Sequence, residues 1–98
     1  MFGNVYLLKQ GELLIGTLYV EDTDFPWVIC RFEPTTAFAP CRPLFDEDIR
    51  VGDTKDVQAW DRAYDAIAAL GLQLIAKESG ADWGNFLLHI QANTAWFR

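Results

Sequence analysis

The sequence predicts an α+β fold, with an antiparallel sheet of about six strands in the order βββ-α-βββ and one long helix packed on one face of the sheet. Two observations lead to this prediction. Short runs rich in β-branched and aromatic residues recur in both halves of the chain, and a single central stretch repeats apolar residues at helical spacing. The 98 residues match the size of one domain, so residues 1–98 are expected to fold around one core.

Three strands are expected before the helix. Residues 4–9 and 13–20 are separated by a Gln-Gly-Glu turn at 10–12, which predicts a tight hairpin. The third strand covers residues 27–33 and is bounded by two prolines. Successive side chains of a strand point to opposite faces, and both faces of this one carry apolar groups. It is therefore predicted to lie in the interior of the sheet, with Trp27, Ile29 and Arg31 on one face and Val28, Cys30 and Phe32 on the other.

Residues 34–52 are expected to form an irregular flap. The segment contains prolines at 34, 40 and 43, with Phe38 and Phe45 among them. A connection of this length is longer than the usual loop, and its spaced aromatic residues favour packing against an apolar surface. We expect the flap to fold over the sheet.

One amphipathic helix is expected at residues 54–70. Asp53 or Thr54 is predicted as its N-cap, and Gly71 supplies the residue after its end, where φ turns positive. The predicted buried stripe has helical spacing and consists of Val57, Trp60, Tyr64 and Ile67. The opposite face is expected to be polar, with Lys55, Asp61, Arg62 and Asp65.

Three further strands are expected after the helix, at residues 72–77, 85–91 and 94–98. The last two are predicted to form a hairpin through Ala92-Asn93. Alternation within the strand at 85–91 places His89 on the face opposite to Leu88 and Ile90.

The charge of the chain excludes some classes of partner. Eight Lys and Arg against fourteen Asp and Glu give a formal net charge of −6, which opposes binding to nucleic acid and to anionic membranes. The amino-terminal segment lacks the cationic start of a signal peptide, and no apolar run approaches the roughly 20 residues of a membrane span. We therefore expect a cytoplasmic protein with reduced cysteines and without a cofactor.

The common catalytic constellations are missing from the sequence. His89 is the only histidine, so it carries any histidine-based chemistry alone, and a half-exposed strand residue is the commoner interpretation. Ser79 lacks the glycine-flanked elbow of a hydrolase, and the glycines form no phosphate-binding loop. The acidic run at 46–48 lacks the alternating spacing of a calcium loop and is interpreted as a solvated surface. No catalytic residue and no metal ligand is assigned.

A pocket or interface is predicted from a small set of residues. Cys41 lies beside Arg42, a cation that favours the thiolate, although a small packing residue is the commoner interpretation. The candidate residues for the pocket or interface are Asp24, Trp27, Arg31, Cys41, His89 and Trp96.

The distribution of apolar residues favours association. One helix covers only one face of a small sheet, yet the predicted strands carry large apolar groups, including Trp27, Leu87 and Trp96, on more than one side. We therefore expect a protein-interaction or accessory domain without catalysis, acting as a homodimer or with a protein partner. The alternative is a small-molecule-binding domain or minor enzyme with a pocket between the flap at 34–52 and the sheet.

Five short segments, spread from the second strand to the last residue, carry a resemblance to known proteins. They are Gly16-Thr17-Leu18, Asp24-Phe25-Pro26-Trp27, Phe32-Glu33-Pro34, Leu87-Leu88-His89-Ile90 and Ala95-Trp96-Phe97-Arg98. Together they resemble a family of small uncharacterised bacterial proteins, chiefly actinobacterial. The resemblance covers nearly the whole chain, and the family has no assigned activity, so it implies no catalytic or binding residue.

Overall fold

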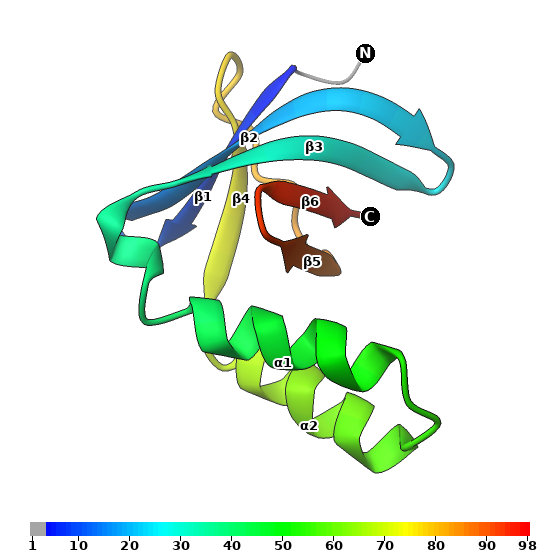
Figure 1. The fold of residues 1–98 in the computed structure, drawn as a ribbon. Helices are drawn as coiled ribbons and strands as arrows, with labels where there is room; N and C mark the ends of the chain where they lie inside the picture. The colour runs from blue at the N-terminus through cyan, green and yellow to red at the C-terminus, as the bar shows by residue number, and fades with distance from the viewer. Residues whose placement is uncertain (1–3) are drawn as a thin grey trace.

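The computed structural model describes residues 4–98, which form a curled antiparallel sheet with a pair of helices beside one end of it (Figure 1). The α+β class and the antiparallel sheet are confirmed. The described strands are β1 (Val5–Gln10), β2 (Leu13–Asp24), β3 (Trp27–Pro34), β4 (Leu72–Ala76), β5 (Leu88–Gln91) and β6 (Thr94–Phe97). Between β3 and β4 lie a 3₁₀ helix, η1 (Thr36–Phe38), and the helices α1 (Arg42–Gly52) and α2 (Val57–Ala68).

The described strands form one sheet in the order β4-β1-β2-β3-β6-β5, and all neighbouring pairs are antiparallel. β3 lies between β2 and β6, as predicted from its two apolar faces. The register shifts between Leu8 and Lys9 and between Val20 and Asp22, and irregularities of this kind bend a strand and increase its twist. Both shifts affect pairings of β2, which curves along the sheet in Figure 1.

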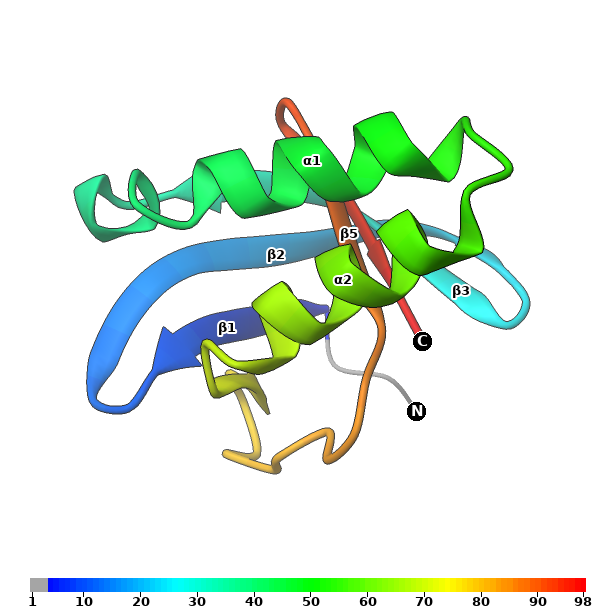
Figure 2. The ribbon, with the colours of Figure 1, turned by 90° about the horizontal axis from the view of Figure 1, so that it is seen from below.

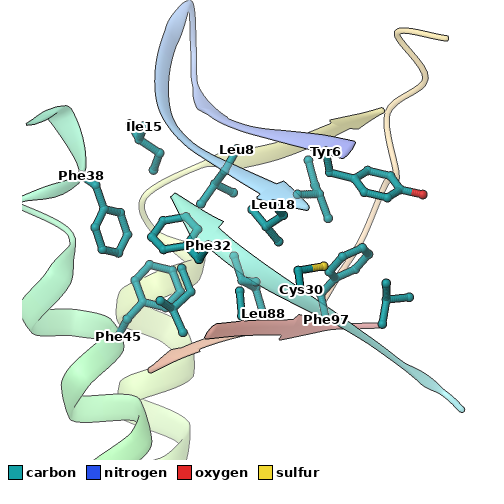
Figure 3. Close-up of a cluster of buried hydrophobic side chains, with 14 of the residues drawn as sticks. Tyr6, Leu8, Ile15, Leu18, Cys30, Phe32, Phe38, Phe45, Leu88 and Phe97 are labelled. Carbon is teal, nitrogen blue, oxygen red and sulfur yellow. The ribbon is translucent and has the colours of Figure 1, made fainter. Parts of the chain in front are cut away.

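The core occupies the inner side of this curl (Figure 3). Alternate residues of the strands point into it, so that Leu18, Cys30 and Phe97 are fully buried. Phe38 of η1 and Phe45 of α1 complete the cluster from the helical side, and the Phe38 ring lies 4.9 Å from the Phe32 ring in an edge-on contact. The sheet therefore covers much of its own apolar surface by curling.

The segment at 34–52 is not the irregular flap that was predicted. Its first residue, Pro34, is the last residue of β3, and the rest of the segment contains η1 and α1. Pro43 lies in the first turn of α1, where the missing N–H breaks no helical hydrogen bond, so this proline begins a helix rather than preventing one. The segment also packs on the inner core through Phe38 and Phe45.

The predicted order βββ-α-βββ is wrong, because two helices, α1 and α2, lie between β3 and β4 where one was expected. The helix predicted at 54–70 was itself wrong in two respects. α2 covers only Val57–Ala68, because Asp56 is its N-cap and accepts a hydrogen bond from the Ala59 amide at 3.1 Å, whereas Asp53 caps the end of α1. Gly71 does take a positive φ of 67°, as predicted.

The second error concerns the buried stripe of this helix. Val57, Trp60 and Tyr64 are 57%, 40% and 53% exposed, whereas Ala63 is buried and Ile67 packs against the core. The reason is that α2 packs beside α1, so that much of its apolar face never reaches the sheet (Figure 2).

The exposed apolar surface therefore lies elsewhere than expected. The outer face of the sheet is mixed, with half-buried Ile29 and Trp96 among polar residues. In residues 4–98 the large exposed apolar side chains are instead Leu13, Leu14, Phe25, Val57, Trp60 and Tyr64. None of the helices described is long and apolar enough to cross a membrane.

Candidate functional site

A groove separates the helix pair from the outer side of β5 and β6, and we call it the helix–sheet groove. Figures 1 and 2 show the two helices passing beneath β5. The groove has a volume of about 550 Å³, within the size range of ligand sites. An adjoining hollow of about 430 Å³ shares Asp48, Tyr64, Leu87 and His89 with it. The groove is lined by Asp48, Ile49, Val51, Gly52, Asp53, Trp60, Asp61, Tyr64, Leu87, His89, Gln91 and Trp96.

A histidine–aspartate pair lies where the two hollows meet. His89 on β5 and Asp48 on α1 bring Nδ1 and Oδ2 to 2.5 Å, and their side chains are 30% and 14% exposed. An ionised carboxylate only accepts hydrogen bonds, so Nδ1–H is the donor. In the neutral imidazole, Nε2 is then the acceptor. The pair fixes the ring orientation of His89 and ties α1 to β5.

Aromatic rings flank His89 on the sheet. Trp96 lies directly opposite His89 in the β5–β6 pair, with the ring centroids 5.6 Å apart. Trp27 lies on β3, the strand beyond β6, and its ring centroid is 5.5 Å from that of His89. The guanidinium of Arg98 lies over the Trp27 ring at 4.9 Å, a distance typical of a cation–π contact.

The opposite wall is formed by α2. The Trp60 indole donates from Nε1 to the Val51 carbonyl at 2.5 Å, which holds this ring against the end of α1. Thr54 donates its hydroxyl to the same carbonyl at 2.7 Å and so fixes the connection between the helices. Tyr64 follows Trp60 by about one helical turn and is more exposed. The wall is thus held in place while its rings remain accessible.

The charge of the groove has a single sign. Its described lining contains the carboxylates of Asp48, Asp53 and Asp61 and contains neither lysine nor arginine. Val51 and Gly52 belong to the last turn of α1, where the helix carries partial negative charge. By contrast, Arg50 and Arg62 line a different hollow, together with Glu47. The groove is therefore electrostatically suited to a cation.

Three of the predicted site residues meet at this groove. Trp27, His89 and Trp96 form a contiguous ring cluster, and two of them line the groove. Asp24 is exposed at the end of β2, opposite Trp27 in the register, and does not line the groove. Arg31 also lies outside it, with its guanidinium 4.3 Å from the Tyr19 ring centre and 3.2 Å from a Glu33 carboxylate oxygen.

Cys41 is a packing residue and not part of the site. It is 3% exposed at the start of α1, and burial raises the pKa of its thiol, which opposes the thiolate suggested by the neighbouring Arg42. Arg42 instead lies over the Phe38 ring at 4.8 Å. Cys30 is also buried, as predicted, and burial with a contribution from Glu21 raises its pKa to about 12.

The sequence interpretation missed the helical half of the site. The acidic run was interpreted as a uniform solvated surface, but on α1 its side chains point in different directions. Asp48 binds His89, whereas Glu47 pairs with Arg50, and that hydrogen bond lowers the pKa of Glu47. No group of three or more His, Cys, Asp or Glu side chains in residues 4–98 is placed to hold a metal ion.

Comparison with known proteins gives no relative for this chain. No family model matches it, and neither a curated protein nor a solved structure is similar enough to count as a match. The resemblance to small actinobacterial proteins stays a prediction, and a function is inferred from the residues of the site.

Proposed function

We propose that this chain is an interaction domain that binds a segment of a partner protein in the helix–sheet groove. The observation that carries the proposal is the exposure of Trp60 and Tyr64 beside the Trp96–His89 cluster. Tryptophan and tyrosine are the residues most enriched where binding energy concentrates at interfaces. Exposing large rings to water has no benefit for the isolated fold, because burial of apolar area is what stabilises it.

Two features favour a partner protein over a second copy of the chain. Each copy carries a net charge of −6, and the acidic lining of one groove repels the acidic surface of another. The homodimer predicted from apolar groups left uncovered on the sheet also loses support, because the large exposed apolar groups described lie on α2, at the first two residues of β2 and in the turn that follows β2.

Strand addition is a less suitable mode of binding. β5 is the last strand of the sheet, but α1 packs along it, and Leu88 and Ile90 are 5% and 0% exposed. A partner strand has no access to backbone groups that are covered in this way. Side chains in the groove, rather than the β5 edge, are therefore the proposed contact.

Affinity capture with matched variants tests the proposal. We expect a specific partner to be retained by the wild-type chain and by Val57→Ala, which alters an exposed apolar residue of α2 outside the groove lining. Tyr64→Ala should lose it. Capture of the same proteins by the wild type, Val57→Ala and Tyr64→Ala would contradict a role for the groove. A stable dimer that light scattering detects in both the wild type and Tyr64→Ala would favour self-association through another surface.

The Asp48–His89 pair favours a second candidate function, in which the groove binds a small molecule. An imidazole oriented by a carboxylate is a suitable hydrogen-bonding or acid–base group. A thermal-shift screen tests this candidate, because a ligand at about 100 times its Kd stabilises the folded state by about 2.7 kcal/mol. A ligand that raises the Tm of the wild type but not of His89→Gln would support it. A Tm increase that His89→Gln retains would count against it.

A further inference from the structure

We propose that the helix–sheet groove receives an arginine side chain from a basic segment of the partner protein. This inference rests on the proposed function and adds the chemistry of the occupant. Three properties of the groove carry it: the sign of its charge, the nature of its walls and its size.

Charge identifies the occupant as a cation. Asp48, Asp53 and Asp61 contribute carboxylates from α1, from the residue after α1 and from α2, and the described lining contributes no lysine or arginine to balance them. Asp48 already accepts from His89, which leaves the carboxylates of Asp53 and Asp61 without a cationic group in the described lining. Charge complementarity of this kind selects partners and speeds their association.

The aromatic walls favour a guanidinium over an ammonium group. A guanidinium is planar, stacks on rings, and forms paired hydrogen bonds with a carboxylate, whereas an ammonium group is a compact and strongly hydrated charge. The chain itself uses this contact: Arg31 lies over Tyr19, Arg42 over Phe38 and Arg98 over Trp27. The last pair adjoins His89, so a guanidinium already stacks on an indole at the edge of the site.

The size of the groove indicates a protein segment as the source of the arginine. A volume of about 550 Å³, continued by a hollow of about 430 Å³, exceeds what one side chain fills. The lining also includes the half-buried apolar residues Ile49 and Leu87, which a free small cation leaves without a partner. Neighbouring apolar residues of a peptide supply that contact.

Peptide pools with one defined position provide the test. Three pools of short peptides have the same randomised flanks and differ only at the central position, which is arginine, lysine or citrulline; citrulline keeps the shape of arginine without its charge. Binding to the immobilised chain is measured at low and high salt. We expect the arginine pool to be retained at least about tenfold over the citrulline pool, with less retention at high salt.

Matched variants connect retention to the groove. Asp61→Asn and Tyr64→Ala should each lower retention of the arginine pool by about threefold to tenfold. Asp65→Asn and Val57→Ala are controls on the same helix and outside the groove lining, and they should retain it like the wild type. Equal losses for the controls would overturn the location of the site.

Other outcomes separate this inference from the proposed function. Equal retention of the arginine and citrulline pools would refute recognition of a cation while leaving a protein-binding groove. If the chain retains no peptide pool but still captures a partner in a Tyr64-dependent manner, recognition of arginine is refuted and the protein-binding groove is not. If it neither retains a pool nor captures a partner, both proposals are refuted. N-acetylargininamide bound as tightly as the best peptides would overturn the protein source in favour of a small cationic ligand.

Discussion

Replacing Asp48 and His89 by alanine, singly and together, tests whether their hydrogen bond holds the helices against the sheet. The two side chains are 14% and 30% exposed, so the bond is partly shielded from water. A hydrogen bond to a charged group contributes about 1.5–3 kcal/mol, and the exposure of His89 places the expected coupling near the lower end, at about 1.5 kcal/mol. The costs of the two single replacements should therefore add up to about 1.5 kcal/mol more than the cost of the double replacement.

Urea unfolding of the wild type and the three variants measures this coupling. Each curve gives a free energy of unfolding, and the double-mutant cycle removes the effects that each side chain has on its own. Arg50→Ala with Glu47→Ala is the control cycle, because this pair links adjacent turns of α1 on the exposed surface, where water and salt screen its charges, so its coupling should be clearly smaller. A coupling for Asp48 and His89 no larger than that of the control would show that their hydrogen bond does not hold α1 against β5.

Three further predictions concern the core. Phe45→Ala should cost about 3–5 kcal/mol in urea unfolding, because Phe45 is fully buried where α1 meets the sheet, and a cost under about 1 kcal/mol would contradict that packing. Gly16→Ala should cost about 1–3 kcal/mol, since a Cβ there overlaps the buried Phe32 ring, whereas Gly52→Ala, with open space around it, should not destabilise the chain. Burial raises the pKa of Cys30 from 9.0 to about 12. The contribution of its neutral thiol to folding stability is therefore complete below pH 9 and is lost as the pH rises through 12. Iodoacetamide should thus label folded Cys30 only at strongly alkaline pH, and rapid labelling at neutral pH would contradict its burial.

The strands were predictable because their side-chain pattern is local. Alternation in β3 assigned Val28, Cys30 and Phe32 to one face, and all three are buried in the core. The hairpin through Ala92-Asn93 was likewise predictable from the two short apolar runs that flank it. In these segments the alternation that defines a strand also decides which side chains the core receives.

The helices were harder to predict because their environment is not local. Pro43 was interpreted as part of a loop, and only its place in the first turn of α1 reconciles it with a helix. The stripe on α2 correctly predicted a helix, but an apolar stripe does not specify its partner. α1 takes the place beside α2 that had been assigned to the sheet, so Trp60 and Tyr64 remain partly exposed.

The site was predictable only on its sheet side. Trp27, His89 and Trp96 were identified as candidate residues, and pairing of β5 and β3 with β6 brings them together. Asp48 is 41 positions from His89 in the sequence, and no spacing rule connects them. Their meeting depends on the position of α1, which the sequence interpretation had assigned to a flap.

The indole signals of the four tryptophans give the most direct test of the groove as a docking site. Trp60 and Trp96 line the groove, whereas Trp83 packs in edge-on contact with Tyr6 and Phe97 and serves as an internal reference. On addition of the captured partner or of the best arginine peptide, the Nε1–H resonances of Trp60 and Trp96 should shift while that of Trp83 stays in place. A shift at Trp83 with Trp60 and Trp96 unchanged would contradict docking in the groove.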